Sequence, residues 1–319
     1  MCYSAALGRH GYNIVSRGGL VWVESRALAD FPWLLHAFST RSGGFSKGTA
    51  RGLNLGFIAA DSRAHVLRNR REFLSRLGAA EYVLASLRQT HSVHIYQVAK
   101  KRKTEYRPSG YALPEPPPDH ATVGDALVTD EPEILLSVRV ADCLPILLVD
   151  PRRRAVAAVH AGWRGTLARI AEKTVAVMRL IFGSDPRDLH AAIGPGIRSC
   201  CYAVGEEVVA AFCGRFVNGE QYFHAPPPRD PADSLATKYP LLFLARRPPG
   251  HLDNPIPAAH LDLVAATTDQ LQTAGLRASR IHAAEYCTAC RTDLFFSHRR
   301  EGAHTGRSMA VIGIRPGKD

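Results

Sequence analysis

The sequence lacks an apolar run long enough to cross a membrane. Nowhere in its 319 residues do about 18 apolar residues follow one another. Residues 1–19 also lack the long apolar core of a secretory signal peptide. We therefore expect a cytoplasmic protein that has no membrane partner.

Acidic residues are fewer than basic ones, 29 against 40, which gives a net charge of +11. Such an excess suits nucleic acid, an anionic surface or a phosphate-bearing small substrate, and it also suits an ordinary solvated surface. The sequence has no aromatic motif of the RNA-recognition type and no paired cysteine–histidine finger. We therefore expect no nucleic-acid partner, and the net charge by itself decides little more.

The seven cysteines are an odd number in a chain long enough to fold without disulfides. Only Cys287 and Cys290 have the spacing of a metal or redox pair, and no second such pair completes a four-cysteine zinc site. We expect one or two thiols to do chemistry among inert ones. Cys287 and Cys290 are expected to be core or near-surface thiols, with a second metal site as the alternative, and the adjacent Cys200 and Cys201 are expected to be packing residues.

The composition, 46% hydrophobic and 22% charged, is that of a folded protein. The apolar periodicity predicts helices over residues 66–77, 167–181 and 262–274, each followed by a glycine, and strands over 91–98, 134–140, 145–149, 155–160 and 309–314. This alternation predicts a mixed α/β (α+β) fold, with central mixed β-sheets flanked by helices in a single compact domain. Proline-rich stretches near residues 101–120 and 225–257 are expected to be surface insertions, and domain boundaries at these places are the alternative.

One predicted hairpin carries candidate chemistry. Two apolar strands flank a polar turn that begins with Asp150-Pro151. If the strands pair in antiparallel fashion, Cys143 lies almost opposite His160, with Cβ atoms roughly 5 Å apart. A thiol that faces an imidazole forms part of a metal site or a nucleophile–base pair. A buried thiol packed near a satisfied histidine is the structural alternative.

The residues after His160 predict a turn into a helix. Gly162 and Gly165 allow a sharp turn, Thr166 is a suitable N-cap, and the free N–H groups of a helix start favour an anion. Arg164 adds a planar fork that suits phosphate. A purely structural turn is the alternative for this pattern.

A third ligand is needed for a metal, and the sequence offers His91 and His94. Positions three apart on a strand point to opposite faces, so only one of the two is expected to reach a shared site. The alternation alone does not decide between them.

Several motifs together resemble the YfiH-like family, also called the laccase-domain or multicopper polyphenol oxidase family and often described as purine nucleoside phosphorylase. The motifs occur in the family's order: Gln89-Thr-His91, Gly124-Asp-Ala-Leu-Val-Thr129, Ala141-Asp-Cys-Leu-Pro145, His160-Ala-Gly-Trp-Arg-Gly165 and Ile193-Gly-Pro-Gly-Ile-Arg-Ser-Cys-Cys-Tyr202. Further motifs extend the resemblance over about residues 34–314. It implies a family domain over 34–316, preceded by an extension over 1–33 that holds the first strand or strands.

The resemblance implies a catalytic zinc ion held by His91, Cys143 and His160, which selects His91 over His94. Three protein ligands leave a fourth position for water or substrate, as in catalytic zinc sites. Copper is the alternative metal, because imidazole and thiolate both suit it. A laccase needs several coppers, however, and therefore more histidine ligands than this cluster supplies.

The resemblance also implies the activity, which is phosphorolysis of adenosine, inosine and methylthioadenosine together with deamination of adenosine. Arg41 and Arg164 are expected to hold phosphate, and Asp142 is expected either to carry a proton or to orient a metal ligand. The expected partners are a purine nucleoside and phosphate. The expected substrate-binding residues are Asn54, Gly162, Trp163, Gly165 and Tyr202.

Three further functions stay open on the sequence alone. A hydrolytic enzyme that edits a peptidoglycan precursor would use the same metal ligands, and a copper-dependent polyphenol oxidase would use the other metal. A basic nucleic-acid-binding protein with a structural zinc is the non-enzymatic reading, although two histidines and one cysteine do not close a tetrahedron. We expect a monomer or a homodimer.

Overall fold

The computed structural model describes residues 11–100, 105–108, 122–225 and 259–317. The chain divides into two compact units. The first unit comprises Met1–Arg198 and Leu263–Asp319, and the second comprises Ser199–Asp262.

A six-stranded sheet in the first unit has the order β1-β2-β3-β16-β8-β4. Its strands are β1 (Tyr12–Arg17), β2 (Leu20–Ser25), β3 (Leu34–Ser39), β4 (Val83–Ala85), β8 (Ile134–Val140) and β16 (Ser308–Ile314). Neighbouring strands are antiparallel except for the parallel pair β4–β8. The last strand of the chain therefore lies in the middle of this sheet, between β3 and β8.

A seven-stranded sheet in the same unit has the order β15-β11-β9-β10-β7-β5-β6. Its strands are β5 (Ile95–Ala99), β6 (Glu105–Pro108), β7 (Ala126–Thr129), β9 (Leu144–Asp150), β10 (Ala155–Ala161), β11 (His190–Ile193) and β15 (Ile281–Ala283). The pairs β11–β15 and β5–β7 are parallel, and the others are antiparallel.

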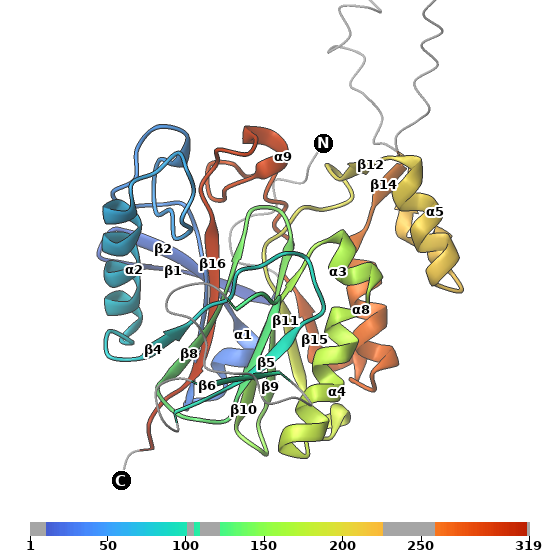
Figure 1. Ribbon diagram of the computed structural model, residues 1–319, viewed down its shortest axis with the longest axis horizontal. Helices are drawn as coiled ribbons and strands as arrows, with labels where there is room; N and C mark the ends of the chain where they lie inside the picture. The colour runs from blue at the N-terminus through green and yellow to red at the C-terminus, as the bar shows by residue number, and fades with distance from the viewer. Residues whose placement is uncertain (1–10, 101–104, 109–121, 226–258, 318–319) are drawn as a thin grey trace, which may run out of the picture. The chain divides into compact units, whose positions relative to one another are not determined.

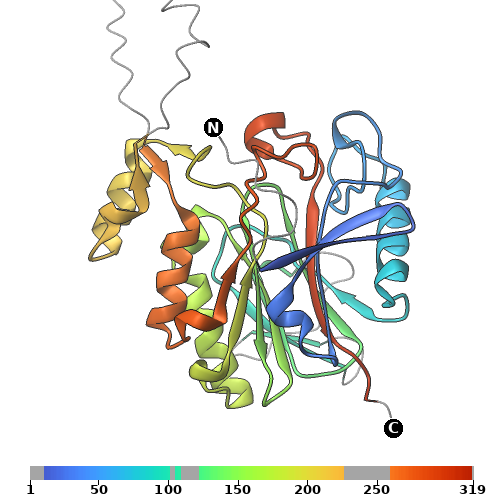
Figure 2. The ribbon, with the colours of Figure 1, turned by 180° about the vertical axis from the view of Figure 1, so that it is seen from behind.

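Helices cover the outer faces of the two sheets. On the six-stranded sheet lies α2 (Arg63–Leu77), and along the seven-stranded sheet lie α3 (Trp163–Leu167), α4 (Ile170–Phe182) and α8 (Leu263–Thr273), as Figure 1 and the reverse view in Figure 2 show. The remaining helices of this unit are short: α1 (Arg26–Ala29), α9 (His298–Glu301), and the 3-10 turns η1 (Gly48–Ala50), η2 (Pro186–Asp188) and η5 (Ala278–Arg280).

The alternation of strand residues builds a separate core on each face of the six-stranded sheet. Phe38 and Ile312 point toward the other sheet, where they pack with Leu147 and Val156. Their neighbours along the same strands, among them Ala37 and Val311, pack instead with Phe73 and Leu77 of α2. This is the expected result of side chains that alternate between faces, with both faces covered.

The second unit is small and contains a three-stranded sheet. The strands β12 (Ala203–Val204), β13 (Phe223–His224) and β14 (Ala259–Leu261) have the order β12-β14-β13, and α5 (Glu206–Arg215) and η3 (Gly219–Tyr222) accompany them. The rings of Phe212, Phe216 and Tyr222 pack together in this unit, with centroids 5.4–6.4 Å apart.

The prediction of a mixed α/β fold with central sheets flanked by helices is confirmed. The predicted helices over 66–77 and 262–274 correspond to α2 and α8, and the glycines Gly78 and Gly275 that follow them have positive φ angles of 73° and 105°. The strands predicted over 134–140, 145–149, 155–160 and 309–314 correspond to β8, β9, β10 and β16. The domain boundaries at 33/34 and 316 stay a prediction.

Two expectations about elements are wrong. The strand predicted over 91–98 begins only at Ile95, and His91 lies in a loop with a φ of 60°. The helix predicted over 167–181 is two helices, because Arg169 adopts a left-handed conformation with a φ of 62° between α3 and α4. A single non-glycine residue in this conformation gives no sequence signal of the break.

The predicted insertions near 101–120 and 225–257 lie largely outside the described residues, as does the start of the N-terminal extension. Within the described part of the chain, no helix is both long and apolar enough to span a bilayer.

Candidate functional site

His91, Cys143 and His160 come together at one end of four neighbouring strands. The strands β9, β10, β7 and β5 lie side by side in that order. Cys143 directly precedes β9, His160 is near the end of β10, and His91 lies in the loop that leads into β5. The ligand atoms of all three side chains lie within 4.8 Å of one another.

The contacts inside this cluster are close. The Sγ atom of Cys143 lies 3.6 Å from Nε2 of His91, and the ring centroids of His91 and His160 are 4.9 Å apart. His160 is 4% exposed, and the other two residues are partly buried. The three side chains thus present two imidazoles and one thiol to a common point.

The predicted hairpin is present, but its register differs from the expected one. The pairing of β9 with β10 is antiparallel and places His160 opposite Pro145 and Ala161 opposite Leu144. Cys143 therefore faces the start of the next turn, at Gly162, and not His160. The thiol of Cys143 thus approaches His160 diagonally, from two positions nearer the open end of the hairpin than Pro145.

The glycine at position 162 leaves room for the side chains of His91 and Cys143. A Cβ atom at this position would lie 2.6 Å from Cδ2 of His91 and 2.9 Å from Sγ of Cys143. Its own φ of −81° is open to any residue, so the need for glycine comes from the neighbouring side chains. This contact explains the glycine at a position that was predicted to bind substrate.

Asp125 holds the loop that carries His91. Its carboxylate accepts hydrogen bonds from the backbone N–H groups of Thr90, His91 and Ser92, at 3.2, 3.1 and 2.6 Å, and from the Ser92 hydroxyl at 2.7 Å. This network fixes the loop in which His91 has its left-handed backbone conformation.

The same carboxylate orients the second histidine. Nδ1 of His160 donates to Oδ1 of Asp125 at 2.8 Å, which leaves Nε2 free to face His91 and Cys143. Burial would raise the pKa of Asp125, but the hydrogen bonds from His160 and Ser92 outweigh it and lower this pKa to about 2. Sequence reasoning assigned Asp125 no role, although the residue lies in one of the motifs that carry the resemblance.

Cys143 and His160 stabilise each other's charged forms. Burial alone would raise the pKa of the Cys143 thiol, but the charge of His160 and hydrogen bonds from both histidines lower it below its usual value. Burial would lower the pKa of His160, and the thiolate and Asp125 raise it instead. The cluster therefore favours a thiolate, which is the form of cysteine that binds metals.

Asp142 is buried and strongly held. Its φ is 92°, one carboxylate oxygen accepts from the Thr288 hydroxyl, and the other accepts from the backbone N–H of Arg299, both at 2.6 Å. Its carbonyl oxygen also accepts from the N–H of Ile197 at 2.7 Å. Asp142 thus ties the turn that carries Cys143 to three other segments of the first unit.

The two arginines predicted to hold phosphate have different surroundings. Arg41 forms an ion pair with Glu301 at 2.7 Å and donates to the carbonyl oxygen of Thr292 at 2.8 Å. Arg164 is exposed and stacks over the ring of Trp163, 4.4 Å from its centroid. The charge of Arg41 is thus already compensated, whereas Arg164 has no carboxylate partner among the described residues.

The remaining predicted substrate contacts are spread over several places. Asn54 is fully buried and bonds to Gly56, Asp61 and the backbone of Arg307. Trp163 and Gly165 lie on α3, and Tyr202 belongs to the second unit. The side chain of Asn54 is therefore fully engaged within the chain.

The N-cap expected at Thr166 is wrong, because Thr166 lies inside α3 and Gly162 precedes the helix. The N–H of Thr166 donates to the carbonyl oxygen of Gly162 at 2.8 Å. That N–H is therefore used within the helix and is not available to an anion.

Most of the chain matches one family of known proteins. A family model described as "Multi-copper polyphenol oxidoreductase laccase" matches residues 35–315. The chain belongs to this family. The resemblance drawn from the motifs is thereby confirmed, and we call the family the laccase-domain family below.

Relatives within the laccase-domain family carry enzyme names. "Purine nucleoside phosphorylase YlmD" of Geobacillus stearothermophilus is 34% identical over 89% of this chain and 92% of its own length. "Adenosine deaminase RL5" of an unknown prokaryotic organism is 34% identical over 87% of this chain and 93% of its own length. The crystal structure of YlmD from Geobacillus stearothermophilus has a TM-score of 0.73 at 32% identity and covers 95% of this chain and 99% of that one.

The residues of the cluster fit a metal ion. Two imidazoles and one thiolate are the donors that zinc and copper both accept, and their atoms are close enough for one ion to contact all three. The lack of a side chain at Gly162 leaves room for His91 and Cys143, and the hydrogen bond to Asp125 fixes the tautomer of His160. The cluster is thus a candidate metal centre of this laccase-domain chain.

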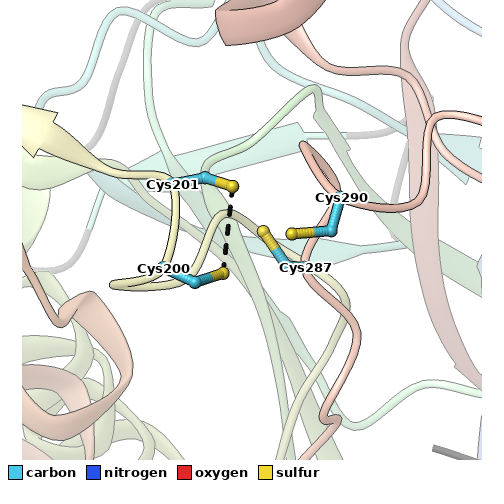
Figure 3. Close-up of side chains that lie close together, drawn as sticks. All are labelled: Cys200, Cys201, Cys287 and Cys290. Carbon is cyan, nitrogen blue, oxygen red and sulfur yellow. Dashed lines mark hydrogen bonds between the residues drawn. The ribbon is translucent and has the colours of Figure 1, made fainter. Parts of the chain in front are cut away.

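Four of the other cysteines are two pairs close in sequence, one pair in each unit, and Figure 3 shows their side chains. Cys287 and Cys290 lie after β15 in the first unit, where Cys287 is buried and Cys290 partly buried. In the second unit the sulfur atoms of Cys200 and Cys201 lie 3.8 Å apart.

Proposed function

We propose that this chain is a zinc-dependent purine nucleoside phosphorylase that also deaminates adenosine. The proposal rests on the convergence of His91, Cys143 and His160, whose ligand atoms all lie within 4.8 Å of one another. The names of relatives that match most of the chain support the same two activities.

A set of three protein ligands is typical of a catalytic zinc site and not of a structural one. A structural zinc is usually closed by four ligands, whereas a catalytic zinc keeps one position open. When bound here, zinc would act as a Lewis acid at that open position. The hydrogen bond from His160 to Asp125 would keep Nε2 of the imidazole directed at the ion.

In phosphorolysis an oxygen of phosphate forms a bond to the anomeric carbon of the ribose, and the bond from this carbon to the purine nitrogen breaks. The products are the free base, which takes up a proton, and ribose 1-phosphate. Of the two arginines predicted to hold phosphate, Arg41 is neutralised by Glu301, whereas Arg164 is exposed. Trp163, directly beside it, offers an aromatic face to the purine.

We assign Asp142 an orienting role. Both of its carboxylate oxygens already accept hydrogen bonds, from Thr288 and Arg299, so it would have to lose one of them to take up a proton. An Asp142→Asn variant separates the two roles. An orienting role predicts that metal content and both activities fall together, whereas a proton-carrying role predicts loss of deamination with phosphorolysis retained.

The test of the proposal is metal analysis of the purified protein combined with a product survey. Inosine, adenosine and methylthioadenosine are incubated with and without phosphate, and the products are separated by chromatography. We expect one zinc per chain, release of free base only with phosphate, and formation of inosine from adenosine without it.

Variants of two histidines sharpen this test. His160→Ala is expected to lose the metal and both activities, whereas His94→Ala, a change at an exposed histidine three residues from His91, is expected to keep them. Zinc-loaded protein that leaves inosine and adenosine unchanged would contradict the proposal. Copper in place of zinc, together with oxidation of phenols, would favour the oxidase alternative.

A further inference from the structure

Two arginines form hydrogen bonds with the backbone of Leu55, one through its side chain and the other through its carbonyl oxygen. Nε of Arg70, on α2, donates to the carbonyl oxygen of Leu55 at 2.9 Å. The carbonyl oxygen of Arg307, just before β16, accepts from the N–H of Leu55 at 3.0 Å. The side chain of Arg307 also passes over Gly56, where a Cβ atom would lie 2.7 Å from its Cβ and Cγ atoms.

A third arginine lies beside them. Arg139, on β8, pairs in the sheet with Met309, two residues after Arg307, and its Nη2 donates to the carbonyl oxygen of Leu87 at 2.7 Å. Burial and the charge of Arg307 lower the pKa of Arg139. Burial and then the charges of Arg139 and Arg63 lower the pKa of Arg70 to about 10.

None of these three guanidinium groups forms an ion pair with a described residue. Within the described part of the chain, no carboxylate lies within ion-pair distance of Arg70, Arg139 or Arg307. Arg70 is only 9% exposed, and its Nη2 atom is buried without a hydrogen-bond partner. The guanidinium of Arg70 lies over the ring of Phe57, with Cζ 4.4 Å from the ring centroid, but its Nη2 stays without an acceptor. Buried N–H groups that lack an acceptor are costly, which suggests that an anion completes the arginine cluster.

One member of the arginine cluster, Arg307, lies close enough to the candidate metal centre to interact with it electrostatically. Arg139 is four residues before Cys143 in the chain, and the backbone N–H of Arg307 is fixed by the side chain of Asn54 at 2.8 Å. Burial lowers the pKa of Arg307, while the negative charges of Cys143 and Asp142 oppose this effect. The positive charge of Arg307 therefore acts directly on the residues around the metal ligands.

We propose that Arg70, Arg139 and Arg307 form the seat of the phosphate co-substrate, an inference that rests on the proposed phosphorylase function. Guanidinium groups bind phosphate through paired N–H donors, and several of them together suit a dianion. Asn54 then acts as a positioning residue for Arg307. Arg41 differs from these three because Glu301 already neutralises it.

The experiment measures the binding of phosphate to the zinc-loaded protein in two ways. Calorimetry gives the dissociation constant of inorganic phosphate without nucleoside, and initial rates of inosine cleavage give the KM for phosphate. In Arg70→Lys, which keeps the charge but loses the fork, and in Arg139→Gln, we expect both constants to rise about 10- to 100-fold, the loss expected for one charged hydrogen bond. Deamination of adenosine in phosphate-free buffer is expected to change less than about threefold.

Arg71→Gln is the matched control, because Arg71 is the exposed neighbour of Arg70 on α2. It removes a positive charge from the same helix, a larger change in charge than Arg70→Lys makes, and is expected to leave both phosphate constants unchanged. Thermal melts of each variant verify that it is folded, and Arg139→Gln tests the seat independently if Arg70→Lys does not fold.

The outcomes separate this inference from the proposed function. If inosine cleavage needs phosphate but both phosphate constants are unchanged in Arg70→Lys and Arg139→Gln, the phosphate seat is wrong and the phosphorylase function stands. The same holds if the phosphate constants rise only in Arg164→Gln. A wild-type protein that does not cleave inosine but binds phosphate through these arginines contradicts the phosphorylase and supports the seat. A wild-type protein that binds no phosphate at millimolar concentration overturns the seat.

Discussion

Asp125 connects both histidines of the candidate metal centre through a single carboxylate. It accepts from three backbone N–H groups around His91, from the Ser92 hydroxyl and from Nδ1 of His160. The two oxygens of an ionised carboxylate offer about four acceptor sites, so these five hydrogen bonds use its full accepting capacity. The position of each imidazole therefore depends on the charge of this one side chain.

Replacing Asp125 with Asn is expected to weaken metal binding about 10- to 100-fold, the usual effect of losing a partner that orients a metal ligand. The amide nitrogen of Asn cannot accept the N–H groups that one carboxylate oxygen now accepts, so the His91 loop or His160 must move. Competition with a chromophoric chelator measures the affinity. Asp130→Asn, a change at an exposed aspartate near the end of the same motif, is the control. Unchanged affinity in Asp125→Asn would refute the orienting role.

The β9–β10 hairpin carries Cys143 and His160 at its open end and is closed by a turn at Asp150. The carboxylate of Asp150 accepts from the backbone N–H groups of Arg152 and Arg153, at 2.9 and 3.0 Å. Side chains that cap their own turn in this way stabilise it locally. The turn and the metal ligands thus lie at opposite ends of the same pair of strands.

Asp150→Ala is expected to lower the free energy of unfolding by about 1–2 kcal/mol, because two backbone donors lose their acceptor. Metal affinity and activity per folded molecule should stay unchanged, since the change lies at the far end of the hairpin from the ligands. Urea denaturation of the metal-loaded protein measures the loss. Asp150→Asn keeps an acceptor oxygen and is expected to lose less. An equal loss in both variants would show that the charge, and not the turn hydrogen bonds, stabilises this end.

The sequence predicts this hairpin well because its signals are local. The Asp150-Pro151 turn start and the apolar runs on either side lie within one short segment. The register is not local, because buried apolar strands offer no alternation that would favour one pairing over its neighbour. For this reason the strands were predicted correctly, whereas the partner of His160 was not.

The loop of His91 shows the opposite case. Its residues alternate like a strand, yet three of its backbone donors bind a carboxylate about 35 positions later in the chain. No local pattern contains that information, and the choice of His91 over His94 came only from the resemblance to the family. The arginine cluster was missed for the same reason, because Arg70, Arg139 and Arg307 come from three distant segments.

At the scale of the first unit, one titratable group is buried in the six-stranded sheet, far from the metal ligands in sequence. His36 of β3 is 6% exposed and lies opposite Ile312 of β16, and its Nε2 accepts from the backbone N–H of Ser25 at 3.0 Å. Burial lowers its pKa from the usual 6.5 to about 4, and the charge of Arg315 adds to this shift. The carbonyl oxygen of Ser25, 3.2 Å from Nε2, opposes the shift because it can accept a hydrogen bond from the protonated ring.

The sign of the resulting pH dependence follows from proton uptake. Between about pH 6.5 and pH 4 the unfolded chain protonates His36 while the folded chain does not, so the free energy of unfolding falls as the pH is lowered through this window. A shift from 6.5 to about 4 corresponds to a loss of about 3 kcal/mol at the acid end. Above pH 6.5 His36 makes no pH-dependent contribution.

His36→Gln removes the titratable imidazole and keeps a side-chain oxygen that can accept a hydrogen bond from the backbone N–H of Ser25. The expected outcome is a flatter stability curve, with the difference between wild type and variant changing by about 3 kcal/mol from pH 7 to pH 4. Urea denaturation across this range measures it, with both proteins at the same metal content so that ligand protonation cancels. His282 and His190 also have pKa values lowered by burial and titrate in the same direction, but they are common to both proteins. Parallel curves for wild type and variant would show that His36 accepts a proton without unfolding the sheet.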